Sequence, residues 1–227
     1  MTPEITVRLF TNDQFYLDKV FYSNVYKLAN LPEKSVVVDI GAHVGYFALN
    51  SVVRGAAKVY CFEPNRYNFE CLLTNTRDVR DTIVTHNFAV LFDDSTLEFE
   101  VPKFNENIYF DFGAIDIAEQ SSEKKEVSPV FSLDSVLTKF IQDKKIDLLK
   151  INLGGEYETD VLCASKYINC AEAVCGIAIG DGASQFDKLV AHMNTNGFKN
   201  VKLLPTGDEG ETLFVFSKSD SSKLFQI

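Results

Sequence analysis

A glycine-bearing turn between a buried strand and a helix is the feature that most constrains this chain. Residues 36–40 (VVVDI) have the apolar, β-branched character of a buried strand, and apolar residues recur at helical spacing over residues 44–54. The turn between them has the pattern D-x-G-x-x-x-G, formed by Asp39, Gly41 and Gly45. Glycine lets the backbone approach a ligand closely, and helix-start amides and a strand-end carboxylate present polar groups to it. The pattern predicts a ligand-binding corner at the edge of a parallel sheet.

A second carboxylate strengthens this interpretation. Residues 58–63 (KVYCFE) predict the next strand, which Pro64 ends, so that Glu63 lies at its tip. A carboxylate in this place can accept hydrogen bonds from both ribose hydroxyls of an adenosyl ligand. Ala42 and His43 stand where a dinucleotide fingerprint would have its middle glycine, which argues against a pyrophosphate and leaves a nicotinamide enzyme as a weaker alternative. Each carboxylate also has a structural interpretation: Asp39 can serve as a helix cap, and Glu63 as a solvated strand end.

Short β-branched runs alternate with helical patterns along the rest of the chain. This order is typical of parallel strands that are joined by crossover helices. We predict further strands at residues 82–86, 146–151 and 174–179, a half-exposed edge strand at 97–101, a C-terminal antiparallel hairpin at 198–204 and 212–217, and helices at 68–75, 132–143 and 184–196. The predicted fold class is α/β, a Rossmann-like sandwich with a mostly parallel, seven-stranded sheet. Residues 1–227 are interpreted as one domain, with an N-terminal extension at 1–34 and an irregular insertion or lid at 102–129.

Composition limits the partners of this chain. The formal net charge of −10 and the pI near 4.8 disfavour a nucleic-acid partner, because binding a phosphate backbone requires clustered Lys and Arg. The five cysteines form no C-x-x-C pair and the three histidines are scattered, so we expect reduced thiols and no metal site. Residues 1–9 lack the apolar core of a secretory signal, and no apolar run approaches the roughly 20 residues of a membrane span. We therefore expect a soluble, cytoplasmic protein without a membrane partner, and we leave a homo-oligomer open.

Five segments together are similar to a known family. They are residues 36–49 (VVVDIGAHVGYFAL), 61–75 (CFEPNRYNFECLLTN), 87–90 (NFAV), 131–134 (FSLD) and 146–151 (IDLLKI). In this order they resemble the FkbM family of S-adenosylmethionine-dependent methyltransferases. The resemblance implies a class I methyltransferase fold, S-adenosylmethionine as the cofactor, and O-methylation of a sugar or another small molecule. It implies cofactor contacts in the glycine turn, at the second strand tip and beside the adenine, and our cofactor-binding candidates are Asp39, Gly41, His43, Gly45, Glu63, Pro64, Asn87 and Phe88.

The motif of the fourth predicted parallel strand departs from that family. The usual pattern is K-I-D-x-E-G, whereas residues 150–155 are K-I-N-L-G-G, so two expected carboxylates are missing. Methyl transfer is an in-line displacement from an activated sulfonium, and positioning of the acceptor can supply much of its acceleration. We select Lys150, Asn152 and Glu156 as catalytic candidates. Lys150 could equally be a strand-end cation, and Glu156 could serve only helix-start electrostatics.

Two functions are compatible with these patterns. The first is an S-adenosylmethionine-dependent methyltransferase that acts on a small-molecule or carbohydrate acceptor. The second is a catalytically lapsed adenosyl-binding or assembly protein that keeps the fold but has lost the chemistry.

Overall fold

The computed structural model describes residues 4–9, 11–100, 125–143, 145–154, 157–179, 183–220 and 223–227. The strands are β1 (Val36–Ile40), β2 (Lys58–Phe62), β3 (Ile83–His86), β4 (Ala89–Leu91), β5 (Ser95–Glu100), β6 (Lys125–Ser132), β7 (Ile146–Ile151), β8 (Ala171–Ile179), β9 (Asn200–Pro205) and β10 (Glu211–Ser217). The α-helices are α1 (Asp13–Leu17), α2 (Tyr46–Val53), α3 (Arg66–Asn75), α4 (Leu133–Ser135), α5 (Glu158–Ala164) and α6 (Ala183–Thr195). The π-helical turns η1 (Asp18–Tyr22) and η3 (Val136–Phe140) continue α1 and α4, and η2 (Arg77–Val79) and η4 (Ile168–Cys170) are 3₁₀ turns.

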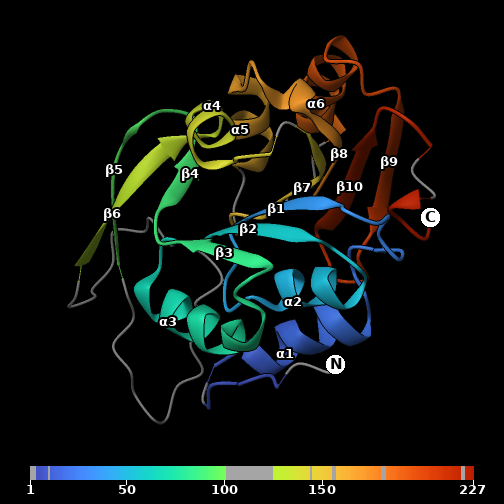
Figure 1. Ribbon diagram of the computed structural model, residues 1–227. Coiled ribbons are helices and arrows are strands. Elements are labelled where there is room, and N and C mark those ends of the chain that lie inside the picture. Colours follow the sequence, from blue (N-terminus) through green and yellow to red (C-terminus); the bar gives the residue numbers. More distant parts are fainter. Residues whose placement is uncertain are drawn as a thin grey trace.

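A seven-stranded sheet in the order β3-β2-β1-β7-β8-β10-β9 forms the centre of the molecule (Figure 1). Strands β3, β2, β1, β7 and β8 are parallel, whereas β10 is antiparallel to both of its neighbours, β8 and β9. The strand order reverses between β1 and β7, because β2 and β3 extend the sheet on one side of β1 and β7 on the other. In open α/β sheets, ligands bind at the carboxyl ends of the strands beside such a reversal. The predicted α/β class, with a mostly parallel sheet and a C-terminal antiparallel hairpin, is confirmed.

Helices cover both faces of the central sheet, with α1, α2 and α3 on one face and α4, α5 and α6 on the other (Figure 1). Successive side chains of a strand point to opposite faces, so Val38 joins the core under α4–α6 and Val37 joins the core under α2 and α3. Asp39 projects to the same face as Val37. On β7, Leu148 belongs to that same core, and Lys150 lies two residues further on, directly opposite Asp39 in the strand register. The strand register therefore brings a buried acid and a buried base together.

The segment before β1 packs against the face that α2 and α3 cover. The Thr6 amide donates to Asn75 Oδ1 of α3 at 2.7 Å, and the Asn50 amide of α2 donates to the Val20 carbonyl at 3.1 Å. Leu28 forms an antiparallel bridge with a residue near the other end of the chain. These contacts fix α1 and η1 beside the carboxyl ends of the parallel strands.

The three-stranded sheet, in the order β4-β6-β5, is not apparent in the sequence pattern. Strand β4 has only three residues, and β6 contains charged residues at its start and Pro129 within it, so neither shows a clear alternation. Residues 125–129, assigned above to the irregular insertion, belong to β6, which corrects that assignment. Residues 102–124, and with them the expected lid, lie outside the described residues. The strand expected near 97–101 is an edge strand as predicted, but of this smaller sheet.

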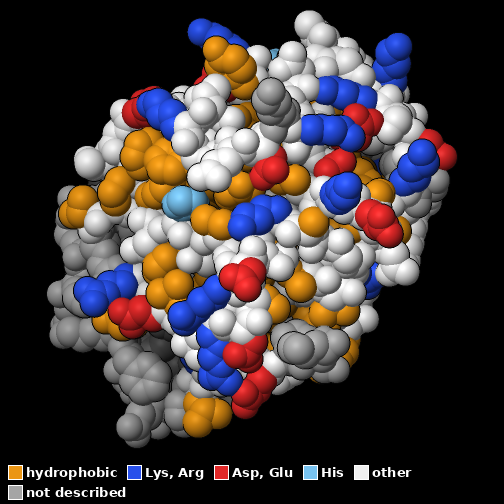
Figure 2. Space-filling model, in the orientation of Figure 1, with side chains coloured by type: hydrophobic (Ala, Val, Ile, Leu, Met, Phe, Trp, Pro, Cys, Tyr) orange, Lys and Arg blue, Asp and Glu red, His pale blue; other side chains and the backbone are white. Residues whose placement is uncertain are grey.

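Three further features concern the helices and the surface. The helix predicted at 132–143 is a single α-turn followed by a π-turn that ends at Phe140. Over the described ranges, no helix is both long enough and apolar enough to cross a bilayer. On the face shown in Figure 2, Lys and Arg side chains are interspersed with Asp and Glu, so this face does not carry charge of a single sign.

Candidate functional site at the glycine corner

The turn after β1 is a corner into which the backbones of three strands converge. The Gly41 and Ala42 amides both donate to the Phe62 carbonyl of β2 at 3.0 Å, and the Asn152 amide after β7 donates to the Ile40 carbonyl at 3.0 Å. Gly41 has φ +72°, and a Cβ at this position would lie 1.8 Å from the Asn152 carbonyl oxygen. Only glycine can occupy this position, because both the backbone conformation and the close approach exclude a side chain.

The amides of this corner are directed into the protein. The amides of Gly41 and Ala42 bond to β2, and that of His43 donates to Glu63 Oε2 at 2.8 Å; the amides expected to face a ligand are those at the start of the following helix. His43 has φ +52°, an uncommon conformation for a residue with a side chain. These three amides therefore shape the corner and do not offer hydrogen bonds to a ligand.

Glu63 is nearly saturated by donors from its own chain. Its carboxylate is 5% exposed and accepts from the His43 amide, from the Asn65 amide at 3.0 Å and from Asn68 Nδ2 at 3.3 Å. Burial raises the pKa of Glu63 to about 7, although these three donors lower it. A carboxylate has about four lone-pair sites, so this one keeps room for about one further hydrogen bond. We expected this carboxylate to accept from both ribose hydroxyls, and that expectation stays a prediction.

The residues predicted beside the adenine separate into two environments. Asn87 is exposed, and its Nδ2 donates to the Glu63 carbonyl at 2.8 Å and to the Pro64 carbonyl at 3.0 Å. Asn87 and Pro64 therefore lie next to Glu63 at the strand ends. Phe88, by contrast, is 7% exposed and packs in an aromatic cluster with Phe62 and other rings of the core. The structure places the Phe88 ring in the core and not beside an open adenine site.

Lys150 and Asp39 form a buried ion pair beneath the corner. Lys150 Nζ lies 2.8 Å from Asp39 Oδ1 and also donates to the carbonyls of Ile40 at 3.2 Å and Gly41 at 2.7 Å. The side chains are 4% and 0% exposed. Burial alone would lower the pKa of Lys150, but the Asp39 carboxylate raises it above its ordinary value. The ammonium uses its three protons on three oxygens, so Lys150 holds the corner together and is not placed to take a proton from an acceptor.

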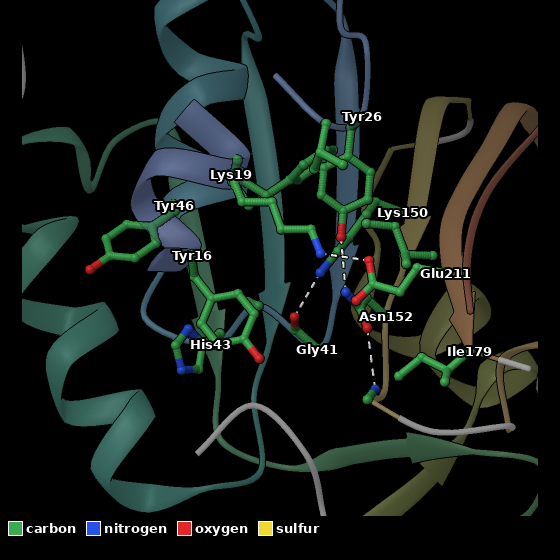
Figure 3. A pocket seen from close by; sticks show the side chains of 16 residues that line it. Tyr16, Lys19, Tyr26, Gly41, His43, Tyr46, Lys150, Asn152, Ile179 and Glu211 are labelled. Atoms are coloured by element: carbon green, nitrogen blue, oxygen red, sulfur yellow. Dashed lines mark hydrogen bonds and ion pairs between the residues drawn. The ribbon is translucent and has the colours of Figure 1, made fainter. Parts of the chain in front are cut away.

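A cavity of about 220 Å³ opens at this corner (Figure 3). Gly41, Lys150 and Asn152 form part of its wall, and Tyr16, Lys19 and Tyr26 of the N-terminal segment form another part. Ile177 and Ile179 at the end of β8 and Glu211 at the start of β10 line the opposite side. The sequence patterns identified the glycine corner, but they gave no sign of the N-terminal wall, because α1 and η1 carry no motif and come before the first predicted strand. Asp39 and Glu63 are not part of this lining.

The other candidates have separate placements. Gly45, with φ +94°, begins α2 and packs against Leu72, since a Cβ there would lie 2.6 Å from Leu72 Cδ1. His43 lines the cavity, and its Nε2 lies 3.5 Å from Arg8 Nη2. Glu156 lies outside the described residues. Among His, Cys, Asp and Glu side chains of the described ranges, no group of three converges in a way that could hold a metal ion.

One lysine and two carboxylates form an ion-pair network at the cavity edge. Lys19 Nζ pairs with Glu211 Oε2 at 2.5 Å and with Asp208, and Thr206 Oγ1 donates to Glu211 at 3.0 Å. This network links η1 to the turn between β9 and β10. It joins the N-terminal wall to the C-terminal hairpin across the cavity (Figure 3).

The sheet order, the parallel strands and a cavity at the point of strand reversal define a Rossmann-like methyltransferase fold. The chain belongs to the FkbM methyltransferase family, because the model of the methyltransferase FkbM domain matches residues 39–200. The match begins at Asp39, so the N-terminal segment that walls the cavity lies outside it.

Solved structures are similar to this chain at low sequence identity. TrmK of M. capricolum, in complex with S-adenosyl-homocysteine, matches with a TM-score of 0.53 and 15% identity, over 91% of this chain and 69% of that one. A protein of the NADB-Rossmann superfamily from Streptococcus agalactiae matches with a TM-score of 0.51 and 12% identity, over 86% and 66% of the two chains. The methyltransferase FkbM from Methylobacillus flagellatus KT has a TM-score of 0.49 and 14% identity, over 92% and 48%. No curated protein matches this chain.

Proposed function

We propose that this chain transfers the methyl group of S-adenosylmethionine to an oxygen atom of a small-molecule or carbohydrate acceptor. The observation that carries the proposal is membership of the FkbM methyltransferase family over residues 39–200. The cavity beside the glycine corner supports it, because it lies at the strand ends where an α/β sheet of this order binds its ligands.

The residues around the corner fit an adenosyl group with a single ribose contact. Glu63 has one lone-pair site left for a hydroxyl, and Asn87 fixes the backbone that carries Glu63. Lys150 holds the carbonyls of the corner in place. When bound, S-adenosylmethionine supplies a methyl group that is already activated, so the contribution expected of the protein is to hold the acceptor in line with it.

A small acceptor is favoured over a nucleic acid by two observations. The chain carries a formal net charge of −10, which disfavours a polyanion because binding a phosphate backbone requires clustered Lys and Arg. The cavity of about 220 Å³ is below the 300–1,000 Å³ typical of sites for drug-sized ligands, so the described walls enclose only part of a cofactor and a small acceptor group.

Calorimetry with S-adenosylmethionine tests the proposal. We expect wild-type protein to bind the cofactor and Glu63→Ala to bind it about tenfold more weakly or worse, since a hydrogen bond to a charged group contributes about 1.5–3 kcal/mol. Glu70→Ala is the matched control, because the Glu70 side chain is 58% exposed on α3 and pairs only with Arg66 in the described contacts. Folded wild-type protein that gives no heat of binding would contradict the proposal.

A second candidate function is a binding or assembly protein without transferase activity. Two features of residues 150–155 favour it. The Lys150 ammonium is bonded to Asp39 and to two backbone carbonyls, and residue 152 is an asparagine where the family usually has an aspartate. The test is to assay methyl transfer to a glycan panel by Asn152→Asp, alone and with Gly154→Glu. Gly154 has φ +72°, so the single variant is the cleaner one, since a side chain at 154 would strain the backbone. Methyl transfer by these variants but not by the wild type would support the second candidate function.

A further inference from the structure

The hydrogen-bond polarity of the cavity wall is fixed by one backbone amide. The Gly154 amide can only donate, and it donates to Asn152 Oδ1 at 3.2 Å. The Asn152 amide nitrogen must therefore face Tyr26, and its Nδ2 donates to the Tyr26 hydroxyl oxygen at 3.0 Å. In this hydrogen bond Asn152 is always the donor and Tyr26 the acceptor, so the hydroxyl proton of Tyr26 is available to another acceptor.

No acceptor within the described part of the chain receives that proton. Tyr26 is 2% exposed and lines the cavity, and its hydroxyl points toward the space between Asn152 and Glu211 (Figure 3). Burial raises the pKa of Tyr26 to about 12, so the hydroxyl keeps its proton at neutral pH. A buried donor without a partner costs free energy comparable to a lost hydrogen bond. The Tyr26 hydroxyl and the second hydrogen of Asn152 Nδ2 therefore form a pair of donors at the cavity wall.

Three titratable side chains of the described lining, those of Lys150, Glu211 and His43, are poorly placed to remove a proton from an alcohol. Lys150 is held as an ammonium by three oxygens, and Glu211 is paired with Lys19. His43 Nε2 faces the ion pair of Arg8 and Asp13, at 3.5 Å from Arg8 Nη2 and 3.8 Å from Asp13 Oδ1. A hydroxyl acceptor would therefore forgo general-base assistance from these three side chains, and such assistance typically contributes 10²–10⁴-fold in rate.

We propose that the methyl acceptor presents a carboxylate, bound by the Tyr26 hydroxyl and Asn152 Nδ2, and that the product is a methyl ester. This inference rests on the proposed methyl transfer and names its substrate class. A carboxylate is ionised at neutral pH and needs no base. One of its oxygens forms the bond to the methyl carbon while the carbon–sulfur bond breaks, and the electron pair of that bond stays on sulfur. A carboxylate and a sulfonium become a neutral ester and a thioether, and no proton moves.

Binding of a matched acid and alcohol tests the donor pair directly. Calorimetry with glucuronate and glucose, each in the presence of S-adenosylhomocysteine and again without it, should show millimolar or tighter binding of glucuronate only. Tyr26→Phe should weaken glucuronate binding about tenfold or more, whereas Tyr60→Phe, which removes a hydroxyl bonded to Asp143 away from the cavity, should leave it unchanged. Asn152→Asp should abolish it, because an aspartate would accept the Tyr26 proton and repel the ligand. Equal binding of glucose, no binding of glucuronate, or an unchanged affinity in Tyr26→Phe overturns the inference.

Two further measurements separate this inference from the proposed function. The cofactor also carries a carboxylate, on its amino-acid end. If Tyr26→Phe weakens binding of S-adenosylhomocysteine but not of methylthioadenosine, which lacks that end, the donor pair belongs to the cofactor and the acceptor assignment is overturned. With methyl-labelled cofactor, a methyl ester releases labelled methanol in mild base, whereas a methyl ether does not. A base-stable product would overturn the inference while supporting methyl transfer, and failure to bind S-adenosylhomocysteine at all would contradict the proposed function itself.

Discussion

The ion pair between Lys150 and Asp39 lies at the base of the glycine corner, and we expect its disruption to be strongly destabilising. Lys150→Met removes an ammonium that lies 2.8 Å from Asp39 Oδ1 and donates to the Ile40 and Gly41 carbonyls. Methionine fills a similar volume but leaves a fully buried carboxylate without its cation. Removing one partner of a buried pair costs about 3–5 kcal/mol. For a chain of this size, the loss corresponds to a fall in Tm of about 6–20 °C.

The loss of unfolding free energy in Lys150→Met should depend on pH, and its direction follows from the direction in which the pKa of Asp39 is shifted. Burial raises the pKa of Asp39, and in the variant no ammonium opposes that rise. The folded variant then holds the proton to a higher pH than the unfolded chain, where the aspartate pKa is about 3.9. A raised folded-state pKa contributes stability below the unfolded pKa that is lost as the pH rises through the folded value. Both proteins lose this contribution as the pH rises above about 4, but the wild type stops losing it at its lower folded-state pKa, so the difference between wild type and variant should widen above that pKa.

Urea unfolding followed by circular dichroism, repeated from acid to neutral pH, measures both effects. Lys145→Met is the control, because Lys145 is 66% exposed, lies 3.1 Å from Asp147 and should contribute less than about 1 kcal/mol. Adding Asp39→Asn to Lys150→Met should recover part of the loss by removing the unpaired charge. The reasoning is refuted if Lys150→Met loses no more stability than Lys145→Met, or if its loss is the same at every pH.

Two other predictions concern the corner. Gly41→Ala should destabilise the protein by several kcal/mol, because its Cβ would lie 1.8 Å from the Asn152 carbonyl oxygen at a positive φ. Gly207→Ala is the control: Gly207 has φ +104° and open space around it, so this substitution should cost only the backbone strain of about 1–3 kcal/mol. Similar losses of the two variants in urea unfolding would contradict the close approach at Gly41. Glu63, whose folded pKa is raised to about 7, should contribute stability that is present below about pH 4 and lost as the pH rises through 7. Glu63→Gln should flatten this slope of unfolding free energy against pH, and an unchanged slope would mean that the carboxylate is already ionised across the range.

Local sequence was a reliable guide wherever one residue type answers one physical requirement. The run from 36 to 40 is apolar because β1 is buried on both faces, and Gly41 is glycine because no other residue fits its positive φ and its contact with Asn152. The strand that contains Lys150 could be located because it, too, is almost wholly apolar and buried. The small sheet was missed, since β4 is too short and β6 too irregular to show a period.

The chemistry of the candidate site was less predictable, because it depends on which partner each polar group finds. The sequence indicated that Glu63 and Lys150 lie at strand tips, and both do. It could not indicate that the amides of residues 43 and 65 would occupy most of the Glu63 carboxylate, or that Lys150 would be locked to Asp39 and two carbonyls. Phe88 shows the same limit, since only packing reveals that its ring belongs to the core.

By itself, the sequence determined the order of the strands of the central sheet along the chain and the corner after the first of them, because these depend on local periodicity and on glycine geometry. The order of its motifs also indicated the family to which the chain is similar. Only the tertiary structure decided what surrounds the corner. Tyr26 and Asn152 are 126 residues apart, and their hydrogen bond exists only because the segment before β1 folds back over the end of β7. The polarity of that bond depends in turn on a backbone amide, and no pattern of side chains along the sequence records the direction in which an amide points.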